Sequence, residues 1–243
     1  MKDSITIYWG SKIRLNHNEL SIIEPVSLIK EMHSNMSKEN LDNFSIAETN
    51  NYFRCPAAKK ENNNIFVIKS PRDFSFKWDP KTNEYYSKHL KTPEKLYSFL
   101  TSRGKLMASL GFWYYFFTNQ NIEMSQLPAY YSDNDFTKST FLPSGKFNIS
   151  KWFRSIDPTF IMKKNEINIK RGDALFYVKF HTDKKVILKN FIVNSKLTKF
   201  HKNTAEFKLH ILSFSLEKLY RIFLSKNYNK RILKEIKNNL SGY

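Results

Sequence analysis

The segment His181-Thr-Asp183 holds two side chains whose types and spacing suit a metal ion. In iron(II) oxygenases with a jelly-roll fold, a His-x-Asp pair supplies two of three ligands, and a distant histidine supplies the third. The later histidines are His201 and His210, but the sequence becomes helical before them, whereas a jelly roll needs several more strands between its ligands. We favour a histidine at a strand end and an aspartate in a turn, with iron(II) binding as the alternative.

The single cysteine, Cys55, is the other candidate for chemistry. No His or Asp lies near it in the sequence to activate the thiol, and a lone cysteine among apolar neighbours is usually buried. The chain has no Gly-x-Gly-x-x-Gly, P-loop, His-Glu-x-x-His or paired-cysteine zinc motif. The sequence therefore favours a protein without catalytic activity, identifies no cofactor, and leaves an enzyme as the alternative.

Charge is the strongest signal in the composition, because the chain carries a net charge of +18. Residues 163–243 hold 19 basic and 6 acidic residues, whereas residues 1–162 hold 21 and 16. Such an excess predicts a polyanionic partner, either nucleic acid or an acidic protein, although lysine-rich codon bias is an alternative explanation. The candidate contacts are four lysines that would share one face if a helix ran unbroken through Asn229, namely Lys226, Lys230, Lys234 and Lys237. The alternative is an ordinary solvated face opposite the apolar one.

The compartment expected from the sequence is a reducing cytoplasm. A single cysteine allows no internal disulfide, and the N-terminus shows no apolar run of the length of a signal peptide. The most apolar stretch, Leu110 to Phe117, is too short to cross a bilayer.

Short segments of alternating polarity predict eight to ten strands. Examples are Ile65–Ile68 and Phe74–Trp78, the latter followed by a hairpin turn to Tyr85 and Tyr86. Residues 111–118 are apolar on both faces, which predicts a central strand, with residues 122–127 as its hairpin partner. The turn Lys170-Arg-Gly-Asp173 is expected to form a hairpin corner. The fold class predicted is mainly β, an antiparallel β-sandwich or jelly-roll-like core.

Helices are expected at both ends of the chain. A proline near the start of Pro25–Met36 predicts a short N-terminal helix. Apolar spacing from Leu216 to Phe223, and again from Ile232 to Leu240, predicts two C-terminal helices separated near Ser225–Asn229. The division that follows is a β-rich core domain over residues 1–195 and a basic helical segment, packed on it, over residues 196–243.

Seven segments in this order resemble uncharacterised proteins of T4-like tailed phages of marine bacteria, cyanophages especially: Ile7–Trp9, Glu24–Leu28, Phe53–Ala57, Phe66–Pro71, Leu142–Arg154, Leu175–Asp183 and Ile232–Leu240. The resemblance implies expression in the cytoplasm of an infected bacterium, or a place in the virion. It implies no activity, cofactor or site residue. The hypothesis is a non-enzymatic binding or assembly protein that contacts a polyanion or a host or virion protein. The alternatives are a jelly-roll metal-dependent oxygenase and a nucleic-acid-binding protein that uses the C-terminal helices.

Overall fold

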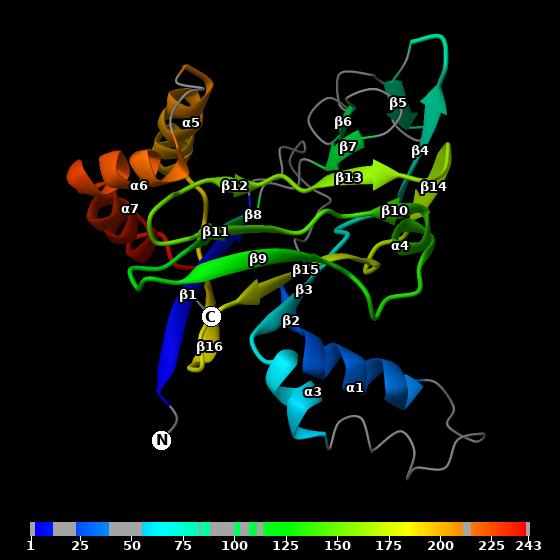
Figure 1. The fold of residues 1–243 in the computed structure, drawn as a ribbon, viewed down its shortest axis with the longest axis horizontal. Helices are drawn as coiled ribbons and strands as arrows, with labels where there is room; N and C mark the ends of the chain where they lie inside the picture. The colour runs from blue at the N-terminus through cyan, green and yellow to red at the C-terminus, as the bar shows by residue number, and fades with distance from the viewer. Residues whose placement is uncertain are drawn as a thin grey trace.

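The computed structural model describes residues 3–11, 23–38, 55–82, 84–87, 100–102, 107–110, 114–210 and 215–241. Within them the fold is mainly β, with strands arranged in four sheets (Figure 1). Every strand pair is antiparallel except β1–β16, which is parallel and joins segments far apart in the sequence.

The strands divide among the sheets as follows. The first sheet has the order β12 (Ser155–Ile156), β8 (Tyr114–Phe117), β1 (Ser4–Ser11) and β16 (Lys185–Asn190). The second has the order β11 (Gly145–Asn148), β9 (Glu123–Pro128), β15 (Ala174–Phe180), β3 (Ile65–Lys69) and β2 (Val26–Ser27). The third has β10 (Thr140–Phe141), β13 (Thr159–Met162), β7 (Met107–Leu110) and β6 (Leu100–Ser102), and the fourth has β14 (Glu166–Ile169), β4 (Phe74–Asp79) and β5 (Glu84–Ser87).

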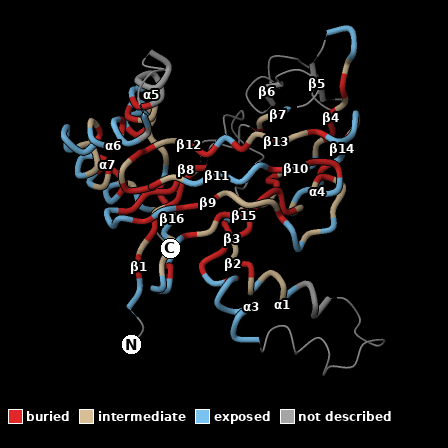
Figure 2. The backbone as a smooth tube through the Cα atoms, in the orientation of Figure 1, coloured by how far each residue is buried: buried red, intermediate tan, exposed pale blue. Residues whose placement is uncertain are grey.

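The strand β8 is buried on both faces, as the sequence predicts. Tyr114 and Phe116 belong to the larger apolar cluster, which lies among the strands. Tyr115 and Phe117 point the other way, into a second cluster shared with the C-terminal helices. Figure 2 shows the buried residues along the central strands and mainly exposed residues on the outer helices. A strand placed between two apolar clusters has no side chain facing water, which explains its unbroken aromatic composition.

Local pairing is predicted correctly for one turn and wrongly for another. The hairpin β4–β5 is confirmed by the pairing of Trp78 with Tyr85. The hairpin expected between β8 and β9 is wrong, because β8 pairs with β1 and β12 whereas β9 pairs with β11 and β15. The hydroxyl of Thr118 donates to the Thr6 carbonyl at 3.1 Å, so the end of β8 stays on β1 while the chain leaves for another sheet.

The turn at Lys170–Asp173 is present, but it does not join a hairpin. Gly172 has a φ of +90°, a conformation that favours glycine, and the Lys170 N–H donates to the Asp173 side chain at 2.8 Å. The flanking strands pair elsewhere, β14 with β4 and β15 with β3. The β3–β4 connection runs beside this turn, since the Ser70 N–H donates to the Asp173 carbonyl at 2.8 Å. Two antiparallel strands therefore bend together from one sheet into the next.

Six helices complete the described residues: α1 (Leu28–Lys38), α3 (Pro56–Glu61), α4 (Asp135–Ser139), α5 (Ser195–His210), α6 (Leu216–Ser225) and α7 (Tyr228–Lys237). The first described element is strand β1, and no helix precedes it among the described residues. Helix α1 begins directly after β2, within the segment Pro25–Met36 for which a helix is expected. The two predicted C-terminal helices are confirmed as α6 and α7, and α5 is an additional helix. None of the helices that the structure describes is both long and apolar enough to cross a bilayer.

Candidate functional site

The C-terminal helices α6 and α7 together carry six basic and two acidic residues. The Ser215 hydroxyl caps α6 by accepting from the Lys218 N–H at 3.3 Å. Asn227, with a φ of 53°, reverses the chain into α7, so the two helices are separate. One face of each is buried, with Leu219 and Phe223 in α6 and Ile232 and Ile236 in α7. The outer faces are thereby presented to solvent.

The four lysines predicted from the sequence are all exposed, and they do not form one continuous helical face. Lys226 caps the C-terminus of α6, and Lys230, Lys234 and Lys237 share a face of α7 at positions i, i+4 and i+7. Among the described residues none of the four has an acidic partner within salt-bridge distance, whereas eight other lysines do. We call these four lysines the basic face.

Acidic side chains near the basic face are few. Of the two glutamates in α6 and α7, Glu217 is exposed and Glu235 is buried. Glu235 accepts from Lys196 at 2.6 Å and from Asn194 at 2.8 Å, and these hydrogen bonds lower the pKa of its carboxyl group. The charge of Glu235 is therefore neutralised within the helical layer and does not offset the lysines.

Arginine adds to the positive charge of α7. The Arg231 guanidinium lies 5.4 Å from the centre of the Phe200 ring and 5.8 Å from that of Tyr228. Cation–π contacts at exposed sites are worth about 0.5–1 kcal/mol each, so this side chain is held against α5. It remains charged and exposed beside the basic face.

His181 lies at the end of β15, and its ring contacts a serine on the neighbouring strand. Its Nε2 is 2.7 Å from the Ser125 hydroxyl, and its backbone N–H donates to the Glu123 carbonyl at 2.9 Å. Partial burial of the ring, followed by the charges of Lys146 and Lys179, lowers the pKa of His181. The surroundings of the ring therefore favour the neutral imidazole.

A neutral imidazole beside a hydroxyl is the pairing from which nucleophilic serines are built. When Nε2 is the unprotonated nitrogen, it accepts the Ser125 hydroxyl proton. Ser125 is only 7% exposed, so its oxygen is poorly accessible to a substrate. What this geometry supports directly is a side-chain link that holds the end of β15 against β9.

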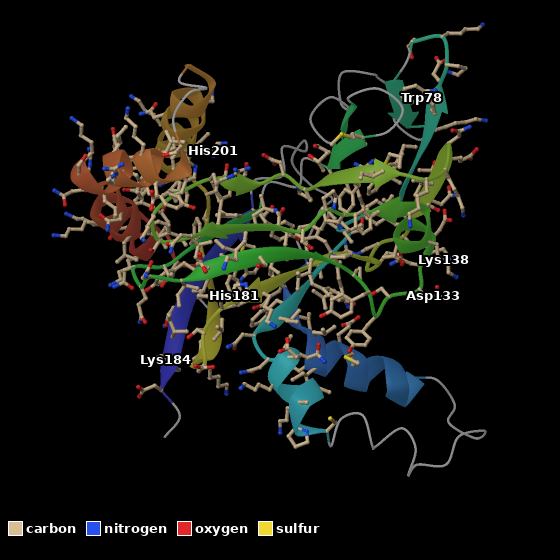
Figure 3. All side chains as sticks on the ribbon, viewed as in Figure 1. Trp78, Asp133, Lys138, His181, Lys184 and His201 are labelled. Atoms are coloured by element: carbon tan, nitrogen blue, oxygen red, sulfur yellow. The ribbon has the colours of Figure 1, made fainter. Side chains whose placement is uncertain are left out.

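The structure does not bring His181 and His201 together. His201 lies on α5, where its ring meets Tyr115 edge-on at 5.3 Å and its Nδ1 accepts from the Ser155 N–H at 3.3 Å. Figure 3 shows the two histidines in different parts of the molecule. Asp183 is exposed in the turn after His181, and the His210 side chain lies outside the described residues. Within those residues, no three His, Cys, Asp or Glu side chains gather as metal ligands do. His181 and Asp183 thus stay a predicted pair of ligands.

Cys55 is exposed, so the expectation that it is buried is wrong. It occupies the N-cap position of α3, directly before Pro56, where its backbone is extended. A residue that precedes proline is biased to extended backbone, which explains its place outside the helix.

A cavity of about 240 Å³ lies where α4, β10 and the loop after β9 meet β13 and β15. Its walls include the buried side chains of Leu142, Phe160 and Leu175. Sequence reasoning missed it, because its lining comes from four separate stretches of the chain, residues 128–132, 137–142 and 160–163 together with Leu175. The paired tyrosines Tyr130 and Tyr131, directly after a strand, were the one local signal.

Comparisons of the chain with protein-family models, with curated proteins and with solved structures gave no match. The function therefore has to be inferred from the geometry and charge of the described residues.

Proposed function

We propose that the protein is a binding protein that contacts a polyanion through the basic face of α6 and α7. The observation that carries this proposal is that these four exposed lysines have no acidic partner among the described residues. By contrast, Lys77, Lys146, Lys164 and Lys184 each pair with an acidic neighbour. An unpaired cation has no salt bridge to break before it contacts a ligand, so it loses only side-chain entropy and hydration. A paired one must first give up its salt bridge.

The spacing of the lysines makes their charges act jointly. From Lys230 to Lys237 the axis of α7 advances about 10 Å at 1.5 Å per residue. The Debye length at physiological salt is about 8 Å, so the potentials of these ammonium groups overlap. Arg231 lies among them, and the one exposed acid of the two helices, Glu217, is at the start of α6. Clustered charge of one sign favours a polymer of phosphates or carboxylates over a single small anion.

The helices that present the basic face are firmly packed. Phe223, Ile232 and Ile236 share an apolar cluster with Tyr115 and Phe117 of β8. A polyanion would therefore meet charges that are already in place, and binding would not require the helices to order first.

The proposal is tested by measuring the affinity for a fluorescein-labelled DNA duplex by anisotropy between 50 and 300 mM salt. Each lysine–phosphate contact contributes about 0.9 to the slope of log affinity against log salt, so neutralising all four should reduce the slope by about 3 to 4. The variant replaces Lys226, Lys230, Lys234 and Lys237 with Gln.

The matched control changes net charge equally at four half-exposed lysines that form salt bridges: Lys77, Lys146, Lys164 and Lys184. It should keep most of the salt slope. A flat salt response of the wild-type protein, or an equal loss in both variants, would contradict the proposal. Competition by polyglutamate distinguishes an acidic protein partner from nucleic acid, because only the former predicts that the peptide binds as tightly as the duplex.

The resemblance to phage proteins supports a setting for this binding. An infected bacterial cytoplasm, or the virion itself, contains both DNA and the acidic surfaces of assembling proteins. Mass spectrometry of purified virions, and a pull-down from infected cells, would test whether the protein belongs to the particle or binds a host component.

A second candidate function is iron(II) chemistry at His181 and Asp183, which rests on the His-x-Asp spacing. It requires a jelly-roll-like sandwich core, which stays a prediction beyond the antiparallel sheets described above, and a third ligand. Metal analysis of the purified protein, with thermal unfolding measured before and after iron(II) is added, decides it. Bound iron that disappears in Asp183→Ala would support it, whereas absence of iron together with an unchanged unfolding temperature would exclude it.

A further inference from the structure

The cavity beside α4 combines an apolar wall with exposed aromatic rings. Leu142, Phe160 and Leu175 are each at most 3% exposed and form the apolar part of its lining. Tyr130 and Phe141 also line it, and they are 51% and 47% exposed. Large apolar side chains that remain half in solvent beside a concave site are typical of a ligand-binding surface.

Tyr130 is held in a defined orientation. Its ring meets the Tyr177 ring edge-on at 5.1 Å and contacts Tyr131 at 4.8 Å. Tyr177 is itself fixed, because its hydroxyl lies 3.2 Å from that of Ser132 and accepts from the Tyr131 N–H at 3.3 Å. The ring of Tyr130 is thus both positioned and exposed, which is what a stacking surface requires.

The charge of the lining is positive. It contains Lys138 and Lys163 and no acidic residue. Lys138 forms a salt bridge with Asp133 at 2.9 Å, and the Asp133 side chain is 85% exposed. Lys163 is exposed, has no ion pair among the described residues, and is anchored by its backbone N–H, which donates to the Ser139 carbonyl at 2.8 Å. An anionic group at the mouth of the cavity would therefore meet at least one available ammonium group.

We propose that this cavity binds a small organic anion, a single aromatic ring system that carries a phosphate or carboxylate group. The ring would stack on Tyr130 or Phe141 above the apolar wall, and Lys163 would bind the anionic group. The cavity is smaller than the roughly 300–1,000 Å³ of pockets for drug-sized ligands, so one ring system with its anionic group is the size that fits. A nucleotide and an aromatic carboxylic acid share this chemistry.

This site is separate from the basic face. Figure 1 shows α4 toward one end of the sheets and α6 and α7 toward the other, and Figure 3 shows Lys138 and Asp133 near α4. A nucleotide bound here would not depend on the polyanion proposed for the helices. Failure of one proposal would leave the other intact.

Isothermal titration calorimetry on the full chain tests the proposal with five probes: uridine monophosphate, adenosine monophosphate, adenosine, indole-3-acetate and inorganic phosphate. We expect at least one ring-bearing anion to bind about tenfold more tightly than adenosine or phosphate. Adenosine lacks the anionic group that forms the charge-assisted hydrogen bond, and phosphate lacks the ring that stacks. Preference for the nucleotides or for indole-3-acetate identifies which source of the chemistry fits.

Three variants locate the binding. Lys163→Gln and Tyr130→Ala alter exposed side chains and should each weaken affinity about tenfold. Lys164→Gln removes the adjacent lysine, which pairs with Asp135 outside the lining, and should leave affinity unchanged. The proposal is overturned if none of the ring-bearing anions binds at 10 mM or below (about the weak limit for a specific site), if phosphate alone binds equally well, or if the two lining variants behave like Lys164→Gln.

Discussion

Strand β1 passes so close to Phe191 that only glycine fits at position 10. A Cβ on Gly10 would lie 2.7 Å from the Phe191 carbonyl oxygen and 2.9 Å from its ring carbon Cε2. Phe191 cannot easily move away, because it is 1% exposed and its N–H donates to the Trp9 carbonyl at 2.8 Å. It also bridges to Leu240, which follows α7. Gly10→Ala should therefore strain the join between β1 and the C-terminal helices.

The sign of the change in stability distinguishes this clash from the usual effect of replacing glycine with alanine. Where the backbone fits, replacing Gly by Ala stabilises a protein by about 0.4–1 kcal/mol through the unfolded state. Overpacking a filled core costs about 1–3 kcal/mol, so the net change for Gly10→Ala should be a loss of about 1–2 kcal/mol. For a chain of this size each kcal/mol corresponds to about 2–4 °C in melting temperature, which predicts a fall of about 2–8 °C.

The matched control is Gly145→Ala in β11. The nearest atom to a Cβ there is the Gln126 Oε1, at 3.7 Å, which is an ordinary contact. Its melting temperature should equal or exceed that of the wild-type protein. Urea unfolding followed by circular dichroism gives both free energies. If Gly10→Ala is as stable as Gly145→Ala, the close approach of β1 to Phe191 is not a constraint and the reasoning is refuted.

Three further changes probe other parts of the structure. Asn64 is buried with a φ of 57°. Its side-chain amide donates to the carbonyls of Thr182 and Lys184 and accepts from the Val186 N–H at 3.1 Å. Asn64→Ala should lower the free energy of unfolding in urea by about 2–3 kcal/mol, because these buried backbone groups lose their partners. Ile232→Ala truncates a side chain on the buried face of α7 that is 0% exposed. It should lower the free energy of unfolding by about 2–5 kcal/mol, so the helical circular-dichroism signal should be lost at a lower urea concentration. The lowered pKa of His181 means that, as the pH falls, the unfolded chain takes up a proton before the folded one does. The contribution of His181 to stability is therefore complete above pH 6.5 and is lost as the pH falls through the lowered value. The melting temperature plotted from pH 8 to 5 should fall less steeply in His181→Gln, and equal slopes in the two proteins would contradict the assignment.

Local sequence signals predicted the elements whose contacts are also local. The hairpin β4–β5 has a five-residue turn signal between alternating strands, and α7 has apolar residues at helical spacing. Helix α5 was not predicted as a separate helix, although the segment from residue 196 was expected to be helical. Among its described side chains the buried ones form a narrow stripe, Leu197, Phe200 and Thr204, in a segment otherwise rich in lysine and asparagine. That spacing of three and four residues was the available signal.

Strand pairing could not be predicted where the partners lie far apart in sequence. The pairing of Ile5 with Val186 joins strands that lie far apart in the sequence, and no local pattern specifies it. The same limit applies to the candidate sites. The four lysines were found from sequence, but whether an acidic partner reaches them depends on the three-dimensional positions of side chains such as Glu217 and Glu235, and within the described part of the chain none does. The exposure of Cys55 likewise depends on tertiary packing. Its apolar neighbours in the sequence predicted burial, and that prediction was wrong.

The position of β8 explains how one small chain can present two independent surfaces. Tyr115 and Phe117 face the helices while Tyr114 and Phe116 face the cluster among the strands, so each apolar cluster has one wall made by the same strand. The helices that carry the basic face pack on the cluster shared with Tyr115 and Phe117, through Ile232 and Ile236. The α4 cavity borders the cluster among the strands, through residues such as Phe160. Side chains on opposite faces of a strand do not touch one another. A ligand at the cavity would therefore pack against atoms that the helices never contact, and occupancy at one surface should leave affinity at the other unchanged unless the strand itself shifts.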